Sequence, residues 1–412
     1  MRKILLLAFL YCFIANVSAE AEKDAKRTTD SLLRTIQVLP HDTTRLIMLS
    51  QIIKSEQMND RCIELADTLL KEASWQNNSE YASFAAYQHA IYYYNHIQLD
   101  SVTKWLNIML PYVEKSNTWD YYYNVKRFQI NLYSYQGNFE KAIEEATDMK
   151  IEASNMKSKY GLSAACISLG NAYVGSSRWK EGLKHYEEAR EYLKNDNNLS
   201  MKFSVLTQLI YASKEMGDNT KLLKYLNEFE VVINSFIKKN PKLQAGYSDI
   251  TSYIEIYYAY YYINIGRYSM ALQHLELAKK YLNMSTYFMY KTLYFDAYAQ
   301  FFLGIKQYEQ AVAYIDTTLV RAKQDTPSNY AEQLLKKANI LYEAGQDDNA
   351  ILCYQQALQI KDSLGIAISN QQLEQIKGSY TLESLELEAT KLNNNMRLVG
   401  LVVIVVVLMA LF

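Results

Sequence analysis

Apolar and aromatic residues recur at three- and four-residue steps along most of the chain, and the stretch Ile254–Leu282 shows this pattern most clearly. Apolar positions lie at helical spacing on both sides of Gly266, and Ala271 and Ala278 follow seven residues apart. The spacing predicts two amphipathic helices joined by a glycine turn. The alanines would let the two backbones approach closely, with tyrosines beside them. Because one hairpin cannot bury its own apolar face, we expect it to repeat.

The hairpin pattern does recur, about every 40 residues. Aligning the opening residue of each second helix with Ala271 gives separations of 40, 40, 40, 40, 49, 40 and 39 residues. Residues twelve positions before this marker are mostly small, and those nine before it are mostly large, as stacked hairpins require. We therefore predict an all-α solenoid of about eight hairpins over residues 42–364. The aligned markers are Cys62, Val102, Ala142, Gly182, Leu222, Ala271, Ala311 and Ala350.

One interval is longer than the others, from Leu222 to Ala271. It contains Pro241 and Gly246, the clearest linker signal in the chain. We predict a lengthened helix followed by a loop here. Separate domains on either side are the less favoured alternative, because the repeat phase resumes at once.

A turn glycine, an aromatic residue and an alanine recur together at these positions, and this combination resembles the tetratricopeptide repeat. The period of 40 exceeds that repeat's usual length of about 34 and is nearer to HEAT-type repeats, but the combination favours the tetratricopeptide reading. The first two hairpins lack the glycine, since Gln57 and Ile97 stand there. The resemblance implies an α-α superhelix that binds partners on its concave surface. Its best copies are Leu169–Tyr173 with Trp179 and Ala189, and Gly266–Tyr268 with Ala271 and Ala278.

The resemblance also implies which residues line the concave groove. In that family they stand three positions before and one position after a small residue of each first helix. Asn and Tyr at such positions suit hydrogen bonding to a peptide backbone or stacking on a sugar. The alternative is a solvated inner face combined with packing between helices. The candidate groove-binding residues are Tyr87, Ile91, Arg127, Asn131, Asn171, Tyr211, Tyr260, Gln300 and Asn339; Ile167, Thr207, Ile256, Asp296 and Leu335 hold the remaining equivalent positions.

The two ends of the chain carry membrane-related patterns. Residues 1–19 combine a basic start, a short apolar run and a small-residue end, which predicts a secretory signal peptide, with residues 20–41 as a lead-in. Residues 397–412 are almost wholly apolar and uncharged from Leu398 onward, which predicts a transmembrane helix. The fifteen apolar residues would span about 22 Å of a hydrocarbon core of about 30 Å, so this helix is apparently truncated. A buried soluble helix is the alternative.

Residues 365–396 between the solenoid and the apolar end are polar with scattered apolar positions at three- and four-residue steps. This spacing predicts one long helix with a weak coiled-coil seam. Such a seam over residues 366–396 could join two copies in a homodimer.

Composition excludes several functional classes. Lys and Arg number 43 against 44 Asp and Glu, so the chain has no electrostatic footprint for nucleic acid. No nucleophile-elbow, zinc-protease, phosphate-loop or dinucleotide pattern occurs. The four cysteines contain no CxxC pair, and His89 and His96, which share a helical face, have no acidic or thiol partner at metal-ligand spacing. We expect no catalytic residue, no cofactor and no metal centre, and we interpret the 37 tyrosines mainly as packing between helices.

The order of segments resembles bacterial periplasmic tetratricopeptide sensors, which have one transmembrane helix and a cytoplasmic histidine kinase or helix-turn-helix output that is absent here. The resemblance implies a periplasmic binding region of a single-pass inner-membrane regulator. Its partner would be a periplasmic protein, peptide or glycan. The alternative is a membrane-anchored periplasmic scaffold that sends no signal.

Overall fold

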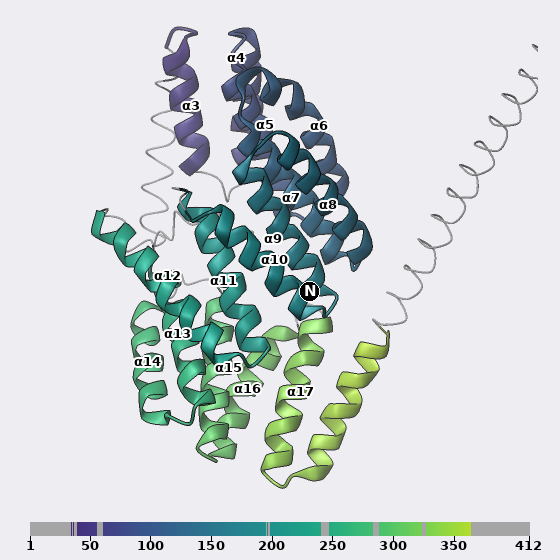
Figure 1. Ribbon diagram of the computed structural model, residues 1–412, viewed down its shortest axis with the longest axis vertical. Coiled ribbons are helices and arrows are strands. Elements are labelled where there is room, and N and C mark those ends of the chain that lie inside the picture. Colours follow the sequence, from purple (N-terminus) through teal and green to yellow (C-terminus); the bar gives the residue numbers. More distant parts are fainter. Residues whose placement is uncertain are drawn as a thin grey trace, which may run out of the picture. The chain divides into compact units, whose positions relative to one another are not determined.

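The computed structural model describes Arg34, Ile36 and residues 39–55, 61–194, 196, 198–239, 247–282, 288–323 and 327–363 (Figure 1). The chain divides into two units after Leu358, and the described residues of the second unit are 359–363. The predicted signal peptide, the predicted helix over 365–396 and the predicted transmembrane helix lie outside the described residues. Within the described part, no helix combines the length and apolarity that crossing a bilayer requires.

The described chain is all-helical, and its helices follow one another as eight hairpins, which confirms the predicted helical-repeat fold. The pairs are α3 (Thr43–Ser55) with α4 (Arg61–Trp75), α5 (Ser79–Asn95) with α6 (Leu99–Ser116), α7 (Trp119–Tyr135) with α8 (Phe139–Asn155), α9 (Lys159–Gly175) with α10 (Trp179–Tyr192), α11 (Leu199–Glu215) with α12 (Asn219–Lys239), α13 (Ser248–Asn264) with α14 (Tyr268–Tyr281), α15 (Phe288–Gly304) with α16 (Tyr308–Ala322), and α17 (Pro327–Glu343) with a helix over residues 347–363.

A residue in the left-handed conformation follows most of these helices. Up to Ser177 it recurs every 20 residues, so it marks the turns within hairpins and the turns between them alike. The next amide donates back into the last helical turn, as Asn138 N does to the Tyr133 carbonyl at 2.9 Å, which is the Schellman arrangement. The residue that donates this amide also caps the following helix in several turns. The left-handed residues up to Ser177 are Asn77, Ile97, Asn117, Gly137, Lys157 and Ser177, and Gly217 follows 40 residues later.

The turn of the second hairpin forms without the glycine that the family pattern places there. Ile97, which stands at the turn of the second hairpin, adopts a φ of 58° itself. A β-branched residue is rarely found in this region of φ. The hydrogen bonds of the turn and the start of α6 directly after it hold the backbone in place.

The first helix of each hairpin belongs to an inner layer, and the second helix covers it. Among these first helices, α5 packs on α7, α7 on α9 and α13 on α15. In α9 almost every side chain is buried, whereas α10 buries Gly182, Leu183, Tyr186 and Ala189. The sequences explain the difference, because α9 has apolar and small residues on all sides and α10 has them on one face.

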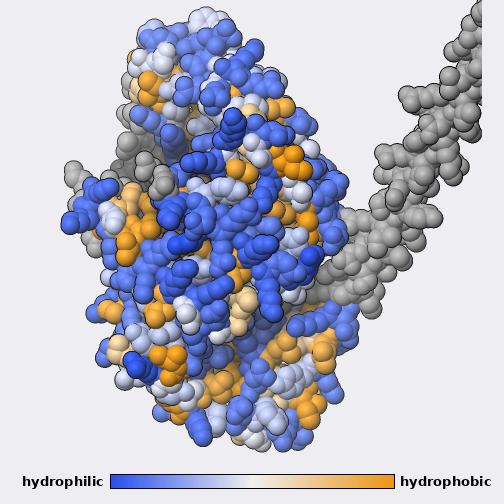
Figure 2. All heavy atoms as spheres, in the orientation of Figure 1, coloured by the Kyte–Doolittle hydropathy of each residue, from blue (hydrophilic) through white to orange (hydrophobic). Residues whose placement is uncertain are grey.

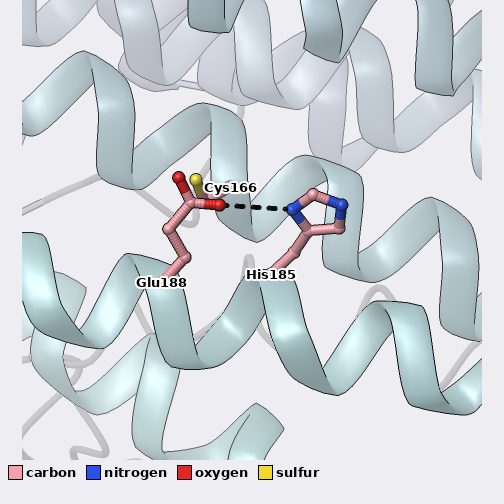
Figure 3. A group of neighbouring side chains, drawn as sticks. All are labelled: Cys166, His185 and Glu188. Atoms are coloured by element: carbon pink, nitrogen blue, oxygen red, sulfur yellow. Dashed lines mark ion pairs between the residues drawn. The ribbon is translucent and has the colours of Figure 1, made fainter.

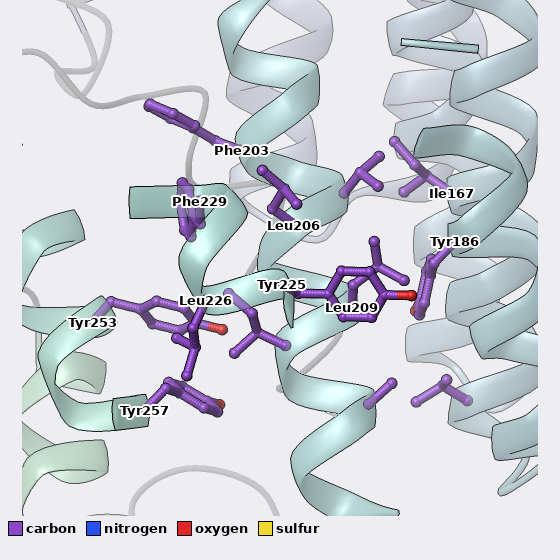
Figure 4. Packing of buried hydrophobic residues seen from close by; sticks show 14 of the residues in the cluster. Ile167, Tyr186, Phe203, Leu206, Leu209, Tyr225, Leu226, Phe229, Tyr253 and Tyr257 are labelled. Atoms are coloured by element: carbon purple, nitrogen blue, oxygen red, sulfur yellow. The ribbon is translucent and has the colours of Figure 1, made fainter. Parts of the chain in front are cut away.

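Aromatic side chains fill the space between successive hairpins, as predicted for the tyrosines (Figure 4). The rings of Phe203 and Phe229 lie 5.1 Å apart between their centres, and Tyr253 lies 6.4 Å from Phe229 and 4.5 Å from Tyr257. Such edge and tilted contacts add about 0.5–1.5 kcal/mol per pair to the burial of the rings themselves. This cluster spans α11, α12 and α13 and therefore covers the long interval in the repeat.

The predicted lengthened helix in that interval is α12, which runs for 21 residues to Lys239. The predicted loop after it falls on residues 240–246, outside the described residues. Beyond it, the Tyr253 hydroxyl of α13 donates to the Thr207 carbonyl of α11 at 3.1 Å, so the first helices remain joined across the interval.

The face of the molecule drawn in Figure 2 is mostly polar, with scattered apolar side chains. Most of the exposed large apolar residues in the described chain belong to second helices, among them Val231, Leu277 and Val320. The polar side chains that are buried follow the opposite distribution.

Candidate functional site

Buried polar side chains gather on the first helices of the hairpins. In the described residues, all of them except Glu72 and Thr318 lie on α3, α5, α7, α9, α11, α13, α15 or α17. A buried polar group destabilises a protein unless it finds a hydrogen-bond partner. The partners of these groups show that neighbouring repeats are joined by side-chain bonds along the inner layer.

Three amide side chains form the first of these connections, here called the amide ladder: Asn131 of α7, Asn171 of α9 and Gln208 of α11. The Asn171 amide nitrogen donates to Asn131 Oδ1 at 3.0 Å, and Gln208 Nε2 donates to Asn171 Oδ1 at 2.7 Å. The Tyr186 hydroxyl donates to the same Asn171 oxygen at 2.9 Å. All four side chains are buried. Asn171 thus uses both lone pairs of its oxygen and links three successive repeats.

A separate set of buried polar groups joins α7 to α5. Arg127 donates from an Nη atom to Asn124 Oδ1 at 3.1 Å, and Asn124 Nδ2 donates to the Tyr87 hydroxyl at 3.4 Å. Tyr87 stacks on Tyr121 with ring centres 4.8 Å apart. These contacts fix the positions of polar groups on α5 and α7.

Four side chains form a second connection, here called the charged ladder: Lys214 of α11, Tyr260 of α13, Asp296 of α15 and Lys336 of α17. Lys214 Nζ lies over the Tyr260 ring, 4.8 Å from its centre. The Tyr260 hydroxyl donates to Asp296 Oδ2 at 2.6 Å, and Lys336 Nζ donates to Asp296 Oδ1 at 2.8 Å. Each first helix from α11 to α17 supplies one member.

Asp296 is buried, yet its surroundings favour the charged carboxylate. Burial alone would raise its pKa, but the ammonium groups of Lys336 and Lys214 and the hydrogen bonds from Lys336 and Tyr260 outweigh burial and lower the pKa to about 2. Burial raises the pKa of Tyr260, and the negative charge of Asp296 raises it further. Asp296 is therefore ionised and Tyr260 neutral at physiological pH.

The structure distributes the predicted groove residues over three levels of exposure. Tyr87, Ile91, Arg127, Asn131, Asn171 and Tyr260 are buried, Tyr211 and Gln300 are half-buried, and Asn339 is exposed and accepts a hydrogen bond from the Tyr354 hydroxyl. Asn131, Asn171 and Tyr260 belong to the two ladders. Asn131, Asn171 and Tyr260 therefore connect neighbouring repeats. Ligand binding at the nine predicted groove positions stays a prediction.

Sequence reasoning missed Gln208, Lys214, Lys336 and Tyr186, because none of them stands at a groove position of the family. One signal could have found part of the arrangement. Asn131 and Asn171 are polar residues one repeat apart, and Asp296 and Lys336 are opposite charges one repeat apart. Helices of neighbouring repeats lie side by side, so such pairs at the repeat spacing are in reach of each other.

No protein-family model matches this chain. No curated protein matches it either. Several solved structures are similar, and at identities of 10–16% their likeness concerns the fold alone.

Aspartyl phosphate phosphatase F from Bacillus subtilis is 10% identical, with 87% of this chain and 92% of that chain covered and a TM-score of 0.51. A signal-transduction ATPase with a tetratricopeptide repeat sensor from Pyrococcus horikoshii is 16% identical over 86% of this chain and 54% of that one, with a TM-score of 0.48. A tetratricopeptide repeat protein from Parabacteroides merdae is 14% identical over 71% and 92%, with a TM-score of 0.34. The chain is thus a helical-repeat solenoid, and tetratricopeptide repeat proteins are among the structures similar to it.

Proposed function

We propose that this chain is a non-enzymatic scaffold whose first helices bind a protein or peptide partner. The observation that supports this function is the concentration of buried polar side chains on one layer of helices. A layer that served packing alone would be stabilised more simply by apolar contacts, because every buried polar group needs a partner. Polar groups held in place by their neighbours are what specific recognition requires.

The charges of the layer indicate the chemistry of the partner. Lys214 and Lys336 are each 19% exposed, whereas Asp296 between them is 6% exposed at its side chain. The cationic ends are therefore the more accessible part of the charged ladder. Lys214 also pairs with Glu215 at 3.0 Å and Lys336 with Glu332 at 3.7 Å. An acidic side chain of the partner would take the place of these glutamates beside the lysines, and its peptide backbone would lie beside the half-buried Tyr211 and Gln300.

Site-specific photo-crosslinking of the full chain in its native cells tests this binding surface. A photoreactive phenylalanine analogue is placed at Tyr211 or Gln300 on the first helices and, as a matched control, at Leu277 on the exposed face of α14. We expect both first-helix positions to yield the same adduct and Leu277 to yield none. Adding the substitution Lys336→Glu to the Gln300 probe should remove the adduct. Equal adducts from Leu277, or different ones from Tyr211 and Gln300, would contradict the proposal.

A finer proposal concerns the location of the chain. The apolar patterns of residues 1–19 and 397–412 support a single-pass protein of the inner membrane with its repeats in the periplasm, acting as a sensor that transmits binding or as an anchored scaffold. Protease added to intact spheroplasts should then degrade the repeat region. A repeat region that resists protease until the membrane is lysed would rule out the periplasmic location and leave the binding proposal standing.

A further inference from the structure

Three potential metal ligands meet in the fourth described hairpin, where α9 packs on α10 (Figure 3). Cys166 comes from α9, and His185 and Glu188 come from α10 at i,i+3 spacing, which places them on one helix face. Their donor atoms all lie within 4.8 Å of one another, and His185 Nδ1 lies 3.5 Å from Glu188 Oε2. The three side chains therefore converge on one point.

The imidazole of His185 turns its Nδ1 atom toward Glu188 (Figure 3). Its ring stacks on Tyr173 at 5.2 Å with an angle of 6° between the planes, and Arg178 lies 4.3 Å from the centre of the Tyr173 ring. Within the described residues the buried Nδ1 atom makes no hydrogen bond, and its ion pair with Glu188 at 3.5 Å lies inside the same cluster. In the tautomer that carries its proton on Nε2, the Nδ1 lone pair faces the cluster and is suited to a metal ion.

We propose that Cys166 Sγ, His185 Nδ1 and a Glu188 carboxylate oxygen bind one zinc ion, with water as the fourth ligand. Thiolate, imidazole and carboxylate together match the preference of Zn²⁺, and three protein ligands with one open position form a familiar zinc arrangement. Tetrahedral zinc brings its ligand atoms to about 3.5 Å from each other, so the side chains need to close by about 1 Å. Water can reach the site because His185 and Glu188 are 20% and 33% exposed.

A competing cation already contacts the carboxylate. Lys150 Nζ of α8 lies 2.7 Å from Glu188 Oε1, and the Tyr192 hydroxyl donates to the same oxygen at 3.2 Å. Zinc would therefore replace the ammonium group of Lys150 at Glu188, which weakens binding relative to a site without the lysine. Burial raises the pKa of the Cys166 thiol to about 12, so the metal-free thiol is protonated and zinc binding releases its proton.

Cobalt substitution tests the site in the full chain. Metal-free protein is titrated with Co²⁺ and followed by absorption spectroscopy, which reports thiolate ligation as a charge-transfer band in the near ultraviolet and tetrahedral geometry as visible bands. We expect both bands to saturate at one Co²⁺ per chain and to disappear when Zn²⁺ is added.

Variants at the cluster separate this site from adventitious binding. Cys166→Ser should remove the charge-transfer band, and His185→Gln and Glu188→Gln should each weaken binding by more than about 100-fold, beyond what loss of a supporting residue costs. Lys150→Met should strengthen binding, which a nonspecific site would not show. Circular dichroism checks that each variant is folded.

Cys353→Ser is the matched control, because Cys353 is also free and lies on the last described helix. It should leave the titration unchanged. A missing charge-transfer band in the unmodified chain, a band that survives Cys166→Ser, or a Lys150→Met variant with unchanged affinity would each overturn the proposal.

Discussion

The amide ladder and the charged ladder meet on one helix, since α11 supplies Gln208 to the first and Lys214 to the second. Both connect first helices of neighbouring repeats through a single side chain from each helix. The amide ladder uses neutral groups whose hydrogen bonds are satisfied locally around Asn171. The charged ladder instead depends on one buried carboxylate that two cations and a hydroxyl surround.

This difference has consequences for stability. A neutral hydrogen bond contributes about 1 kcal/mol net, and its loss costs mainly the desolvation of the partners that remain. A buried charge that loses its partner is far more costly, although the pair as a whole need not stabilise the fold. We therefore expect substitutions in the amide ladder (α7 to α11) and in the charged ladder (α11 to α17) to change the free energy of unfolding by different amounts. We also expect acid to destabilise the charged ladder more than the amide ladder.

The largest effect is expected at Asp296. Asp296→Ala leaves Lys336 and Tyr260 without their shared acceptor and should lower the free energy of unfolding by about 4 kcal/mol, as for other buried ion pairs that lose one member. Urea denaturation measures the loss, and hydrogen exchange should show it in α13 to α17 and not in α5 to α9.

A surface ion pair provides the control for that substitution. Asp316 is 46% exposed and pairs with Lys337 at 2.6 Å. Asp316→Ala should cost less than about 1 kcal/mol. Similar losses of unfolding free energy for Asp296→Ala and Asp316→Ala would mean that the charged ladder stabilises the fold no more than a surface ion pair does.

The next effect concerns the support of the amide ladder. A Cβ atom at Gly170 would lie 2.2 Å from the Tyr186 ring, which is buried and whose hydroxyl holds Asn171. Gly170→Ala should therefore cost about 3 kcal/mol through overpacking. Gly304→Ala is the comparison in α15, which belongs to the charged ladder. A Cβ atom at Gly304 would lie 2.4 Å from the Tyr268 ring. That ring is half-buried and can move, so we expect a smaller loss in urea denaturation. Equal losses would contradict this reading.

Removing the centre of the amide ladder should have a moderate effect. Asn171→Ala leaves polar groups of Asn131, Gln208 and Tyr186 unpaired and should cost about 2 kcal/mol. The exposed Asn339 occupies the equivalent repeat position in α17, so Asn339→Ala is the control and should change stability by less than about 0.5 kcal/mol. Thermal and urea unfolding of both variants measure the two losses. A large loss for Asn171→Ala alone would show that burial sets the cost, and equal losses would show that the repeat position sets it.

The smallest expected effect is the response to acid. The folded-state pKa of Asp296, about 2, lies below its ordinary value of 3.8, so its contribution to stability is present above about pH 4 and is lost as the pH falls toward 2. At pH 3 the loss should be about 1 kcal/mol. Asp296→Asn should lack this component, whereas Asn171→Ala should retain it. Identical acid profiles for Asp296→Asn and the unmodified chain would exclude Asp296 as the titrating group.

Much of the fold could be predicted from the sequence because it follows from local patterns. Small or apolar residues at a nearly fixed period and helical apolar spacing determined the hairpins, and the long interval after Leu222 indicated the extended α12. The ladders could not be predicted in the same way. Gln208 and Lys336 stand next to groove positions, and their partners come from other repeats, so only the packing of first helices shows which side chains meet. The Cys166, His185 and Glu188 cluster was missed for a different reason: Cys166 lies on the other helix of the hairpin, so only the packing of α9 on α10 brings its thiol to the His185 and Glu188 pair.

The left-handed residues every 20 positions from Asn77 to Ser177 imply that the structural unit of this part of the chain is half as long as its sequence period. Turns within and between hairpins are built alike and accept Asn, Ile, Lys, Ser and Gly. An internal deletion from Asn78 to Asn117 would thus splice one turn onto an equivalent turn and preserve which helices face inward. A deletion of half that length would join the same turns equally well. It would nevertheless place second-helix sequences, which are apolar on one face only, into the inner layer. Deletions or insertions that preserve the fold should therefore comprise whole pairs of helices.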